Sequence, residues 1–195
     1  MVIGRRPHAS HYKFRSRNGR DAPVVLVGGE FSIAEQGCDA MVLAAHSNNL
    51  GGPWRSRFDR EILKSSGPQF HDQLARSGLI DGGVFIAKPL EAEVHRGNFR
   101  HLLFVGDDQR KPFREILTAA FLAAEGAMFE QVAMPLLRPE KMFRGGEVEI
   151  AREMIEGVRG YLSQAPVVRS IKAIGFLITH NDGLCTFLHA PFDCA

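Results

Sequence analysis

The 195-residue sequence has few cysteines and no long apolar run, and both absences narrow what the protein can be. Cys38, Cys185 and Cys194 are an odd number at unpatterned spacing, which favours a reduced, cytoplasmic setting over a disulfide framework. The longest apolar stretches are far shorter than the roughly 20 residues that a membrane helix needs. The first 21 residues also lack the apolar core of a signal peptide. We therefore expect neither secretion nor contact with a membrane.

Sequence motifs for several common chemistries are missing as well. There is no G-x-S-x-G nucleophile elbow, no H-E-x-x-H metal site, no paired C-x-x-C and no G-x-x-x-x-G-K phosphate loop. His8 and His11 are close enough to share a metal, but two histidines without a third ligand are weak grounds for a site. The sequence therefore predicts no metal and no bound cofactor.

Net charge is only +2, so the protein is no polycation, but its positive charge is unevenly placed. The first twenty residues hold no acid and six basic residues, namely Arg5, Arg6, Lys13, Arg15, Arg17 and Arg20. Such a segment is either a solvated tail or an arm that contacts nucleic acid electrostatically. We therefore divide the chain into a basic N-terminal extension, residues 1–22, and a domain, residues 23–195, and keep RNA as a candidate partner of the extension.

Short apolar runs alternate with helical patterns along the rest of the chain. Strands are predicted at 24–27, 40–45, 83–87, 101–105, 131–134 and 171–179, and helices at 58–66, 69–76, 111–126 and 146–162. Asp107 or Asp108 is placed to cap the helix at 111–126. Most of the strands are continuously apolar, which suits strands covered on both faces. The predicted fold is an α/β class, three-layer α/β/α sandwich with a mixed, mostly parallel central sheet.

Two connections, 46–57 and 135–146, are the richest in glycine and charge, and each directly follows a predicted strand. In a sheet of this kind, ligands bind beyond the carboxyl ends of the strands. The sequence therefore predicts a binding crevice between these connections. Their arginines suit a phosphorylated ligand, because guanidinium groups bind phosphate through two hydrogen bonds.

The order of these elements resembles that of macro domains, which are ADP-ribose-binding modules, over about residues 24–190. The segment GEFSIAEQGCDAMVLAAHSNNL is similar to the family's opening turn and strand, and FDREILKSSG to the helix that follows. The segment QVAMPLLRPEKMFRGGEVEIAREMI is similar to its later strand, proline, phosphate loop and helix. The loops depart from the family pattern, so the resemblance is to a divergent member.

The resemblance implies roles for residues at the adenine and ribose ends of the ligand. Glu30 stands where an acid binds the adenine amino group, and the neighbouring amide of Phe31 commonly assists. His180, just past the last central strand, is a further adenine contact. His46 replaces the asparagine that faces the distal ribose, and Asp59 matches the aspartate that helps activate water in hydrolytic members.

The remaining ligand contacts implied by the resemblance lie in the two connections. They are Asn48, Asn49, Gly51, Gly52, Arg55 and Arg57 in the first, and Arg138, Lys141, Phe143, Arg144, Gly145 and Gly146 in the second. Two interpretations remain open: either cationic side chains replace the family's backbone amides as phosphate ligands, or the diphosphate site is closed. Asp59 as a helix cap, His46 as a structural histidine and the two asparagines as turn residues are the plainer alternatives.

The leading hypothesis is binding of ADP-ribose or a related phosphorylated nucleotide. If the protein is an enzyme, it hydrolyses ADP-ribosyl or O-acyl-ADP-ribose esters, with Asp59 or His46 activating water. The alternative is a non-catalytic macro-like module that binds RNA or a protein partner.

Overall fold

The computed structural model describes residues 10–15, 21–28, 38–50, 66, 69–88, 99–135, 137–138, 146–165 and 170–177. Its strands are β1 (Ser10–Arg15), β2 (Asp21–Gly28), β3 (Cys38–Ala45), β4 (Val84–Ile86), β5 (Phe99–Gly106), β6 (Gln131–Pro135) and β7 (Ala173–Leu177). Its longer helices are α2 (Gln69–Arg76), α3 (Phe113–Gly126) and α5 (Glu147–Gln164). None of the helices in these ranges combines the length and the hydrophobicity that a membrane crossing requires.

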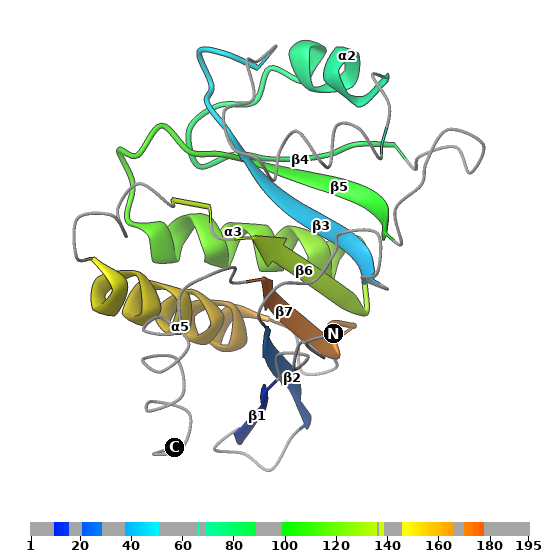
Figure 1. Ribbon diagram of the computed structural model, residues 1–195. Coiled ribbons are helices and arrows are strands. Elements are labelled where there is room, and N and C mark those ends of the chain that lie inside the picture. Colours follow the sequence, from blue (N-terminus) through cyan, green and yellow to red (C-terminus); the bar gives the residue numbers. More distant parts are fainter. Residues whose placement is uncertain are drawn as a thin grey trace, which may run out of the picture.

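The strands form one sheet in the order β1-β2-β7-β6-β3-β5-β4 (Figure 1). The strands β2, β7, β6, β3 and β5 are parallel to one another, whereas β1 pairs antiparallel with β2 and β4 with β5 at the two edges. The prediction of a mixed, mostly parallel sheet is confirmed. The carboxyl ends of the parallel strands meet at one edge of this sheet, which is where its ligand sites are expected.

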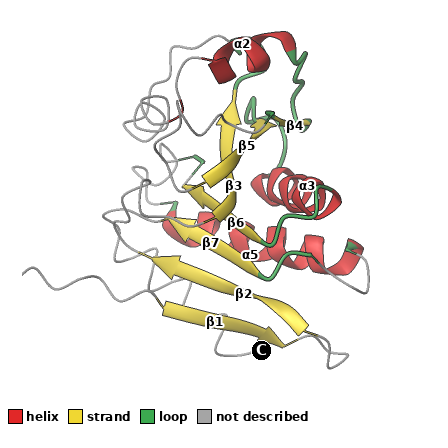
Figure 2. Cartoon of the chain, turned by 90° about the vertical axis from the view of Figure 1, so that its right-hand side faces the viewer, coloured by secondary structure: helices red, strands yellow, loops and turns green. Residues whose placement is uncertain are grey.

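Helices cover both faces of the sheet, with α3 and α5 on one side and α2 on the other (Figure 2). Successive side chains of β3 point to opposite faces, as the period of a strand requires. Val42 packs in the cluster with α3 and α5, whereas Met41 and Leu43 pack with Phe70 and Leu74 of α2. The three-layer α/β/α arrangement predicted from the sequence is therefore correct.

The predicted elements lie close to those of the structure. Each of the six predicted strands is present within a few residues of its expected bounds, and the helices expected at 69–76, 111–126 and 146–162 are α2, α3 and α5. The helix expected at 58–66 lies outside the described residues except at Ser66, which is helical.

The strand β1 was not anticipated, because residues 1–22 were predicted to be an extension outside the domain. Residues Ser10–Arg15 instead pair antiparallel with β2, from Ser10 opposite Val27 to Arg15 opposite Asp21. The sequence SHYKFR alternates polar and aromatic residues, which is a strand pattern. Lysine and arginine are also common in edge strands, where charge discourages pairing with another chain.

The start of α3 is stabilised differently from the sequence prediction. Neither Asp107 nor Asp108 caps it, because Pro112 is the N-cap residue and makes no side-chain cap hydrogen bond. The Arg114 amide donates instead to Glu153 Oε2 of α5 at 2.9 Å, and the Arg114 guanidinium contacts Glu153 Oε1 at 2.8 Å. The capping prediction was wrong, and both aspartates are left for other contacts.

The helices α3 and α5 approach closely because α5 has glycines at the contact. A Cβ placed on Gly157 would lie 2.5 Å from Leu117 Cβ, and one on Gly160 would clash with Thr118 Oγ1. The Thr118 hydroxyl also lies 3.1 Å from the Gly157 carbonyl oxygen, to which it donates. Glycine lowers the intrinsic stability of a helix interior, so close packing is the physical reason for both positions.

We expect Gly157→Ala to lower the free energy of unfolding by about 1–3 kcal/mol, the usual cost of overpacking. The added methyl group meets the base of the Leu117 side chain, which cannot move without shifting α3. Chemical denaturation measures the change. Gly126→Ala is the matched control, since a Cβ there meets nothing within 4 Å, and it is expected to be neutral or mildly stabilising. Equal effects of the two variants would contradict the packing argument.

Candidate functional site

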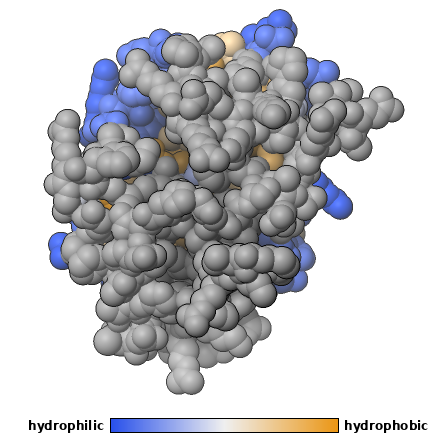
Figure 3. Space-filling view, in the orientation of Figure 1, coloured by the Kyte–Doolittle hydropathy of each residue, from blue (hydrophilic) through white to orange (hydrophobic). Residues whose placement is uncertain are grey.

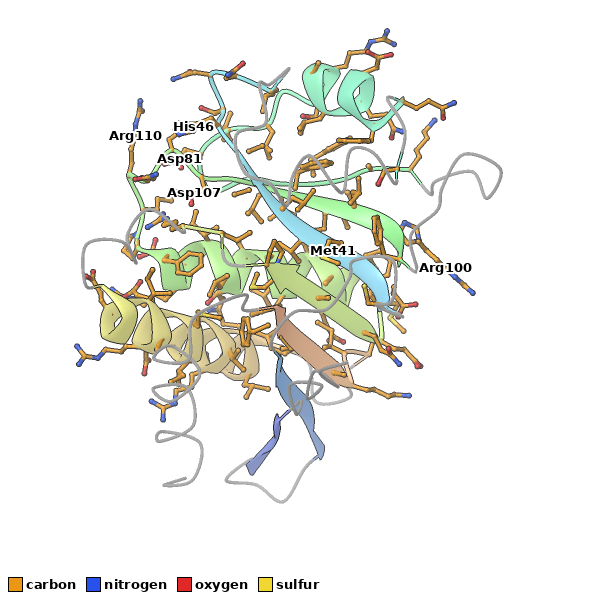
Figure 4. All side chains as sticks on the ribbon, in the orientation of Figure 1. Met41, His46, Asp81, Arg100, Asp107 and Arg110 are labelled. Carbon is orange, nitrogen blue, oxygen red and sulfur yellow. The ribbon has the colours of Figure 1, made fainter. Side chains whose placement is uncertain are left out.

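The connections that follow β3 and β5 lie side by side, at the end of the sheet where the carboxyl ends of the parallel strands meet. Ala45, the last residue of β3, pairs with Gly106, the last residue of β5, and the Asp107 amide donates to the Ala45 carbonyl at 2.9 Å. Figure 4 shows His46, Asp81 and Asp107 gathered at this edge, away from Arg100 near the other end of β5. Polar groups far apart in the sequence are thereby brought into one cluster.

Asp108 is the centre of this cluster. Its carboxylate accepts the Ser47 amide at 2.8 Å through Oδ1 and the Ser47 hydroxyl at 2.5 Å through Oδ2. Asp108 Oδ1 also lies 3.2 Å from Nδ1 of His46. The Asp108 side chain is 4% exposed, whereas that of His46 is 58% exposed. A nearly buried carboxylate therefore contacts an imidazole that is largely exposed to solvent.

The pKa of Asp108 is lowered from its ordinary value of 3.8. The hydrogen bond from the Ser47 side chain is the largest cause; burial opposes it, and the Ser47 amide and His46 lower the pKa further. Asp108 is consequently ionised at neutral and mildly acidic pH and is a permanent acceptor beside the imidazole.

The turn before β4 holds the backbone of Asp108 in place. The Asp108 amide donates to Asp81 Oδ1 at 2.9 Å, and the Gly82 amide donates to the Gly106 carbonyl at 2.7 Å. A Cβ on Gly106 would clash with the carbonyl oxygen of Ile80. The turn and the end of β5 approach through their backbones, so position 106 requires glycine.

Asp107, the neighbour of Asp108, points to a different partner. Its carboxylate binds the Arg138 guanidinium through two hydrogen bonds, Nε to Oδ2 at 2.8 Å and Nη2 to Oδ1 at 2.6 Å. The Arg138 side chain is only 2% exposed, donates also to the Lys111 carbonyl at 2.9 Å, and lies over the Phe113 ring. Arg138 was predicted to bind phosphate, but in this position it anchors the connection after β6 to the connection after β5.

Three other predicted site residues lie in the described ranges. Asn48 and Asn49 are exposed in the turn after β3, where the Asn49 amide donates to the His46 carbonyl at 2.9 Å. Gly146 is the N-cap residue of α5. The remaining predicted residues lie outside the described residues: Glu30, Phe31, Gly51, Gly52, Arg55, Arg57, Asp59, Lys141, Phe143, Arg144, Gly145 and His180. The described residues include no group of three or more histidine, cysteine or acidic side chains suited to a metal.

Sequence reasoning missed three members of the cluster: Ser47, Asp81 and Asp108. The pair Asp107–Asp108 directly follows a continuously apolar strand, the position at which ligand-binding groups are expected. That signal was available but was interpreted as helix capping. Asp81 had no comparable signal, since its role depends on the turn before β4 packing against β5.

The surface over this part of the molecule is polar where it is described. Figure 3 shows hydrophilic side chains at the upper left, over the region from which His46, Asp81 and Arg110 come in Figure 4. Arg110 and Gln109 are exposed in the connection between β5 and α3. Gln109 has a φ of 62°. The Gln109 amide donates to Asp107 Oδ1 at 3.0 Å, which stabilises this left-handed residue.

Comparison with known proteins gives no matching family model and no matching curated protein by sequence. Solved structures do match. A macrodomain from Oceanobacillus iheyensis with ADP superposes with a TM-score of 0.66 over 96% of this chain and 97% of that one, at 13% identity. The chain has the macrodomain fold.

Two further macrodomains give the same result. The macro domain of ganglioside induced differentiation associated protein 2 superposes with a TM-score of 0.68 over 86% of this chain and 83% of that one, at 14% identity. A Trypanosoma brucei macrodomain in complex with ADP-ribose superposes with a TM-score of 0.64 over 87% of this chain and 68% of that one, at 15% identity. The macrodomain fold expected from the order of elements is confirmed, in a divergent sequence.

Proposed function

We propose that this chain binds ADP-ribose or a related phosphorylated nucleotide at the carboxyl ends of its parallel strands. The observation that carries this proposal is the macrodomain fold, which is shared with proteins solved with ADP-ribose or ADP bound. The polar cluster of His46, Ser47 and Asp108 lies at the edge of the sheet where such folds take ligands.

We propose ligand contacts in the order predicted from the sequence. The adenine lies by Glu30, Phe31 and His180, and the distal ribose by His46, Asn48 and Asp59. The diphosphate is held by the connections after β3 and β6 through the cations Arg55, Arg57, Lys141 and Arg144 together with the glycines Gly51, Gly52, Gly145 and Gly146. Arg138 is not among these contacts, because its guanidinium is buried against Asp107.

We further propose hydrolysis of an O-acyl-ADP-ribose or ADP-ribosyl ester at the same site. His46 Nε2 takes a proton from water, and the resulting hydroxide attacks the acyl carbon of the ester. The bond from the acyl carbon to the ribose oxygen breaks, and the imidazolium returns its proton to that oxygen. The products are the carboxylic acid and ADP-ribose. Asp59 is the second candidate for activating the water.

Calorimetric titration with ADP-ribose tests the binding proposal, with AMP and ribose 5-phosphate as partial ligands. We expect ADP-ribose to bind more tightly than either fragment, because it alone reaches both ends of the proposed site. Single-stranded RNA in the same buffer tests the alternative partner class. Absence of heat with ADP-ribose, or equal affinity for AMP, would contradict the proposed site.

Hydrolysis of O-acetyl-ADP-ribose by the native protein, His46→Ala and Asp59→Ala tests the catalytic proposal. We expect His46→Ala to reduce kcat on the order of a hundredfold, the ordinary contribution of a general base. The exposed Asp72 of α2 provides a control, since Asp72→Ala changes a remote carboxylate. No turnover by the native protein, or native rates in both site variants, would exclude these residues as the base.

A further inference from the structure

The contacts around His46 suggest how its imidazole is prepared for chemistry. An imidazole acts as a base only through a nitrogen that carries no proton, so the position of its single proton in the neutral form matters. Nδ1 of His46 lies 3.2 Å from a carboxylate that is ionised at neutral pH and can only accept a hydrogen bond. The neutral ring therefore keeps its proton on Nδ1.

The opposite nitrogen, Nε2, is the one that this arrangement leaves for a ligand. Nδ1 faces Asp108, and the ring is 58% exposed, so its Nε2 edge is turned away from the carboxylate. No described residue hydrogen-bonds this nitrogen. The ring is thus fixed in one tautomer, with its lone pair available at the edge of the sheet.

Asp108 is itself fixed by contacts from two connections. Its oxygens accept the Ser47 amide and hydroxyl, and its own amide is bound by Asp81 Oδ1 at 2.9 Å. These contacts tie the end of β3, the end of β5 and the turn before β4 together. An exposed ion pair contributes little stability and needs no such fixed hydrogen bonds. The hydrogen bonds at Asp108 therefore indicate a carboxylate with a defined position.

We propose that Asp108 is a positioning residue that sets the tautomer and orientation of His46 for the proposed hydrolysis. This inference rests on the proposed function for its role, but the arrangement itself is a property of the free protein. Asp108 does not touch the substrate. It acts by keeping Nε2 of His46 unprotonated and directed outward, in the way that a carboxylate orients the histidine of a catalytic dyad.

The first test is nitrogen-15 NMR of the histidine rings in the free protein at neutral pH. The native His46 is expected to show the signature of the tautomer protonated on Nδ1. In Asp108→Ala, no carboxylate accepts a hydrogen bond from Nδ1, and the fraction of the ring in the tautomer protonated on Nε2 is expected to rise. A native ring protonated on Nε2 would overturn the proposal, whatever the protein binds.

The second test separates turnover from binding. Asp108→Ala, which removes the acceptor for Nδ1, is expected to lower kcat for O-acetyl-ADP-ribose about ten- to a hundredfold while leaving the Kd for ADP-ribose within about twofold. Asp72→Ala makes the same chemical change at an exposed position of α2 and is expected to keep native rates. Ser47→Ala retains the Asp108 carboxylate beside His46 and is expected to keep the native tautomer, which the same nitrogen-15 measurement reads.

The outcomes distinguish this proposal from the function on which it rests. A protein that neither binds nor hydrolyses the nucleotide refutes the proposed function, while the tautomer measurement still decides the role of Asp108. If Asp108→Ala does not fold, the tautomer in the native protein and in Ser47→Ala decides it. Native kcat in a folded Asp108→Ala would assign Asp108 a purely structural role.

Discussion

Arg138→Met is expected to lower the free energy of unfolding by about 3–5 kcal/mol, the range found when one partner of a buried ion pair is removed. The two side chains of the Arg138–Asp107 pair are 2% and 3% exposed, so water cannot solvate the carboxylate that remains. Among the described residues, the Asp107 carboxylate would keep the hydrogen bond from the Gln109 amide at 3.0 Å. The contact of the guanidinium with the Phe113 ring would be lost as well.

Equilibrium denaturation in urea measures this effect, and an exposed ion pair supplies the control. Arg159 contacts Glu156 at 2.8 Å on the surface of α5, with side chains 51% and 41% exposed. Arg159→Met makes the same substitution and is expected to cost under about 1 kcal/mol, because water replaces the lost partner. A similar cost at both positions would show that burial of the Arg138 pair does not matter.

The double variant Asp107→Asn/Arg138→Met separates the charge from the packing. Removing the second charge relieves the uncompensated carboxylate, so the double variant is expected to be more stable than Arg138→Met alone by about 1–2 kcal/mol. Additive losses would instead mean that the two side chains stabilise the fold independently.

Glu125→Gln is expected to have the second largest effect, lowering the free energy of unfolding by about 2–4 kcal/mol. The Glu125 carboxylate is buried at the end of α3 and accepts the Tyr161 hydroxyl at 2.6 Å and the Ser170 amide at 2.6 Å. It also accepts the Ser170 hydroxyl at 2.9 Å and the Ile171 amide at 3.3 Å. An amide group has one accepting atom in place of two, so at least one buried donor loses its partner.

The effect of Glu125→Gln is expected to depend on pH. Burial alone would raise the pKa of Glu125, but the hydrogen bonds from Tyr161, Ser170 and Ile171 outweigh it, and the pKa is lowered from 4.5. A carboxyl group with a lowered pKa stabilises the folded state fully above its unfolded pKa, and this stabilisation is lost as the pH falls through the folded pKa. The difference between native protein and variant should therefore be constant from pH 6 to 8 and shrink below about pH 4.5.

Glu130→Gln is the matched control for that series. Glu130 contacts Lys172 at 3.1 Å on the surface, with side chains 59% and 66% exposed, so its loss is expected to cost under about 0.5 kcal/mol. A difference between native protein and Glu125→Gln that grows as the pH falls would have the wrong sign and would contradict the assignment.

The sequence predicts the fold well because the core strands carry a strong pattern. Strands such as AMVLAA and HLLFV are continuously apolar and separated by helical periodicity, which specifies a parallel sheet covered on both faces. The strand β1 lacked this signal, since an edge strand with cations looks like a solvated tail. Its pairing with β2 is a tertiary contact that local sequence does not reveal.

The site was predicted less completely, for a physical reason. His46 was proposed because it directly follows a predicted strand and stands where the family that the sequence resembles has a ligand-facing asparagine. Asp108 and Asp81 were missed because their roles come from hydrogen bonds across 61 and 27 residues of chain. Arg138 was assigned to phosphate because its charge is visible in the sequence, whereas its burial against Asp107 is not.

The adjacent carboxylates of Asp107 and Asp108 bind in opposite directions, one to a guanidinium in the interior and one to an imidazole at the surface. The link between β5 and α3 consequently has a fixed register. Deleting one residue before this pair would move Asp108 into the place of Asp107 and leave His46 without its carboxylate. Inserting one residue would move Asp107 into the place of Asp108 and leave the buried Arg138 unpaired, so the spacing from the end of β5 to the pair cannot change by one residue without loss of one of the two contacts.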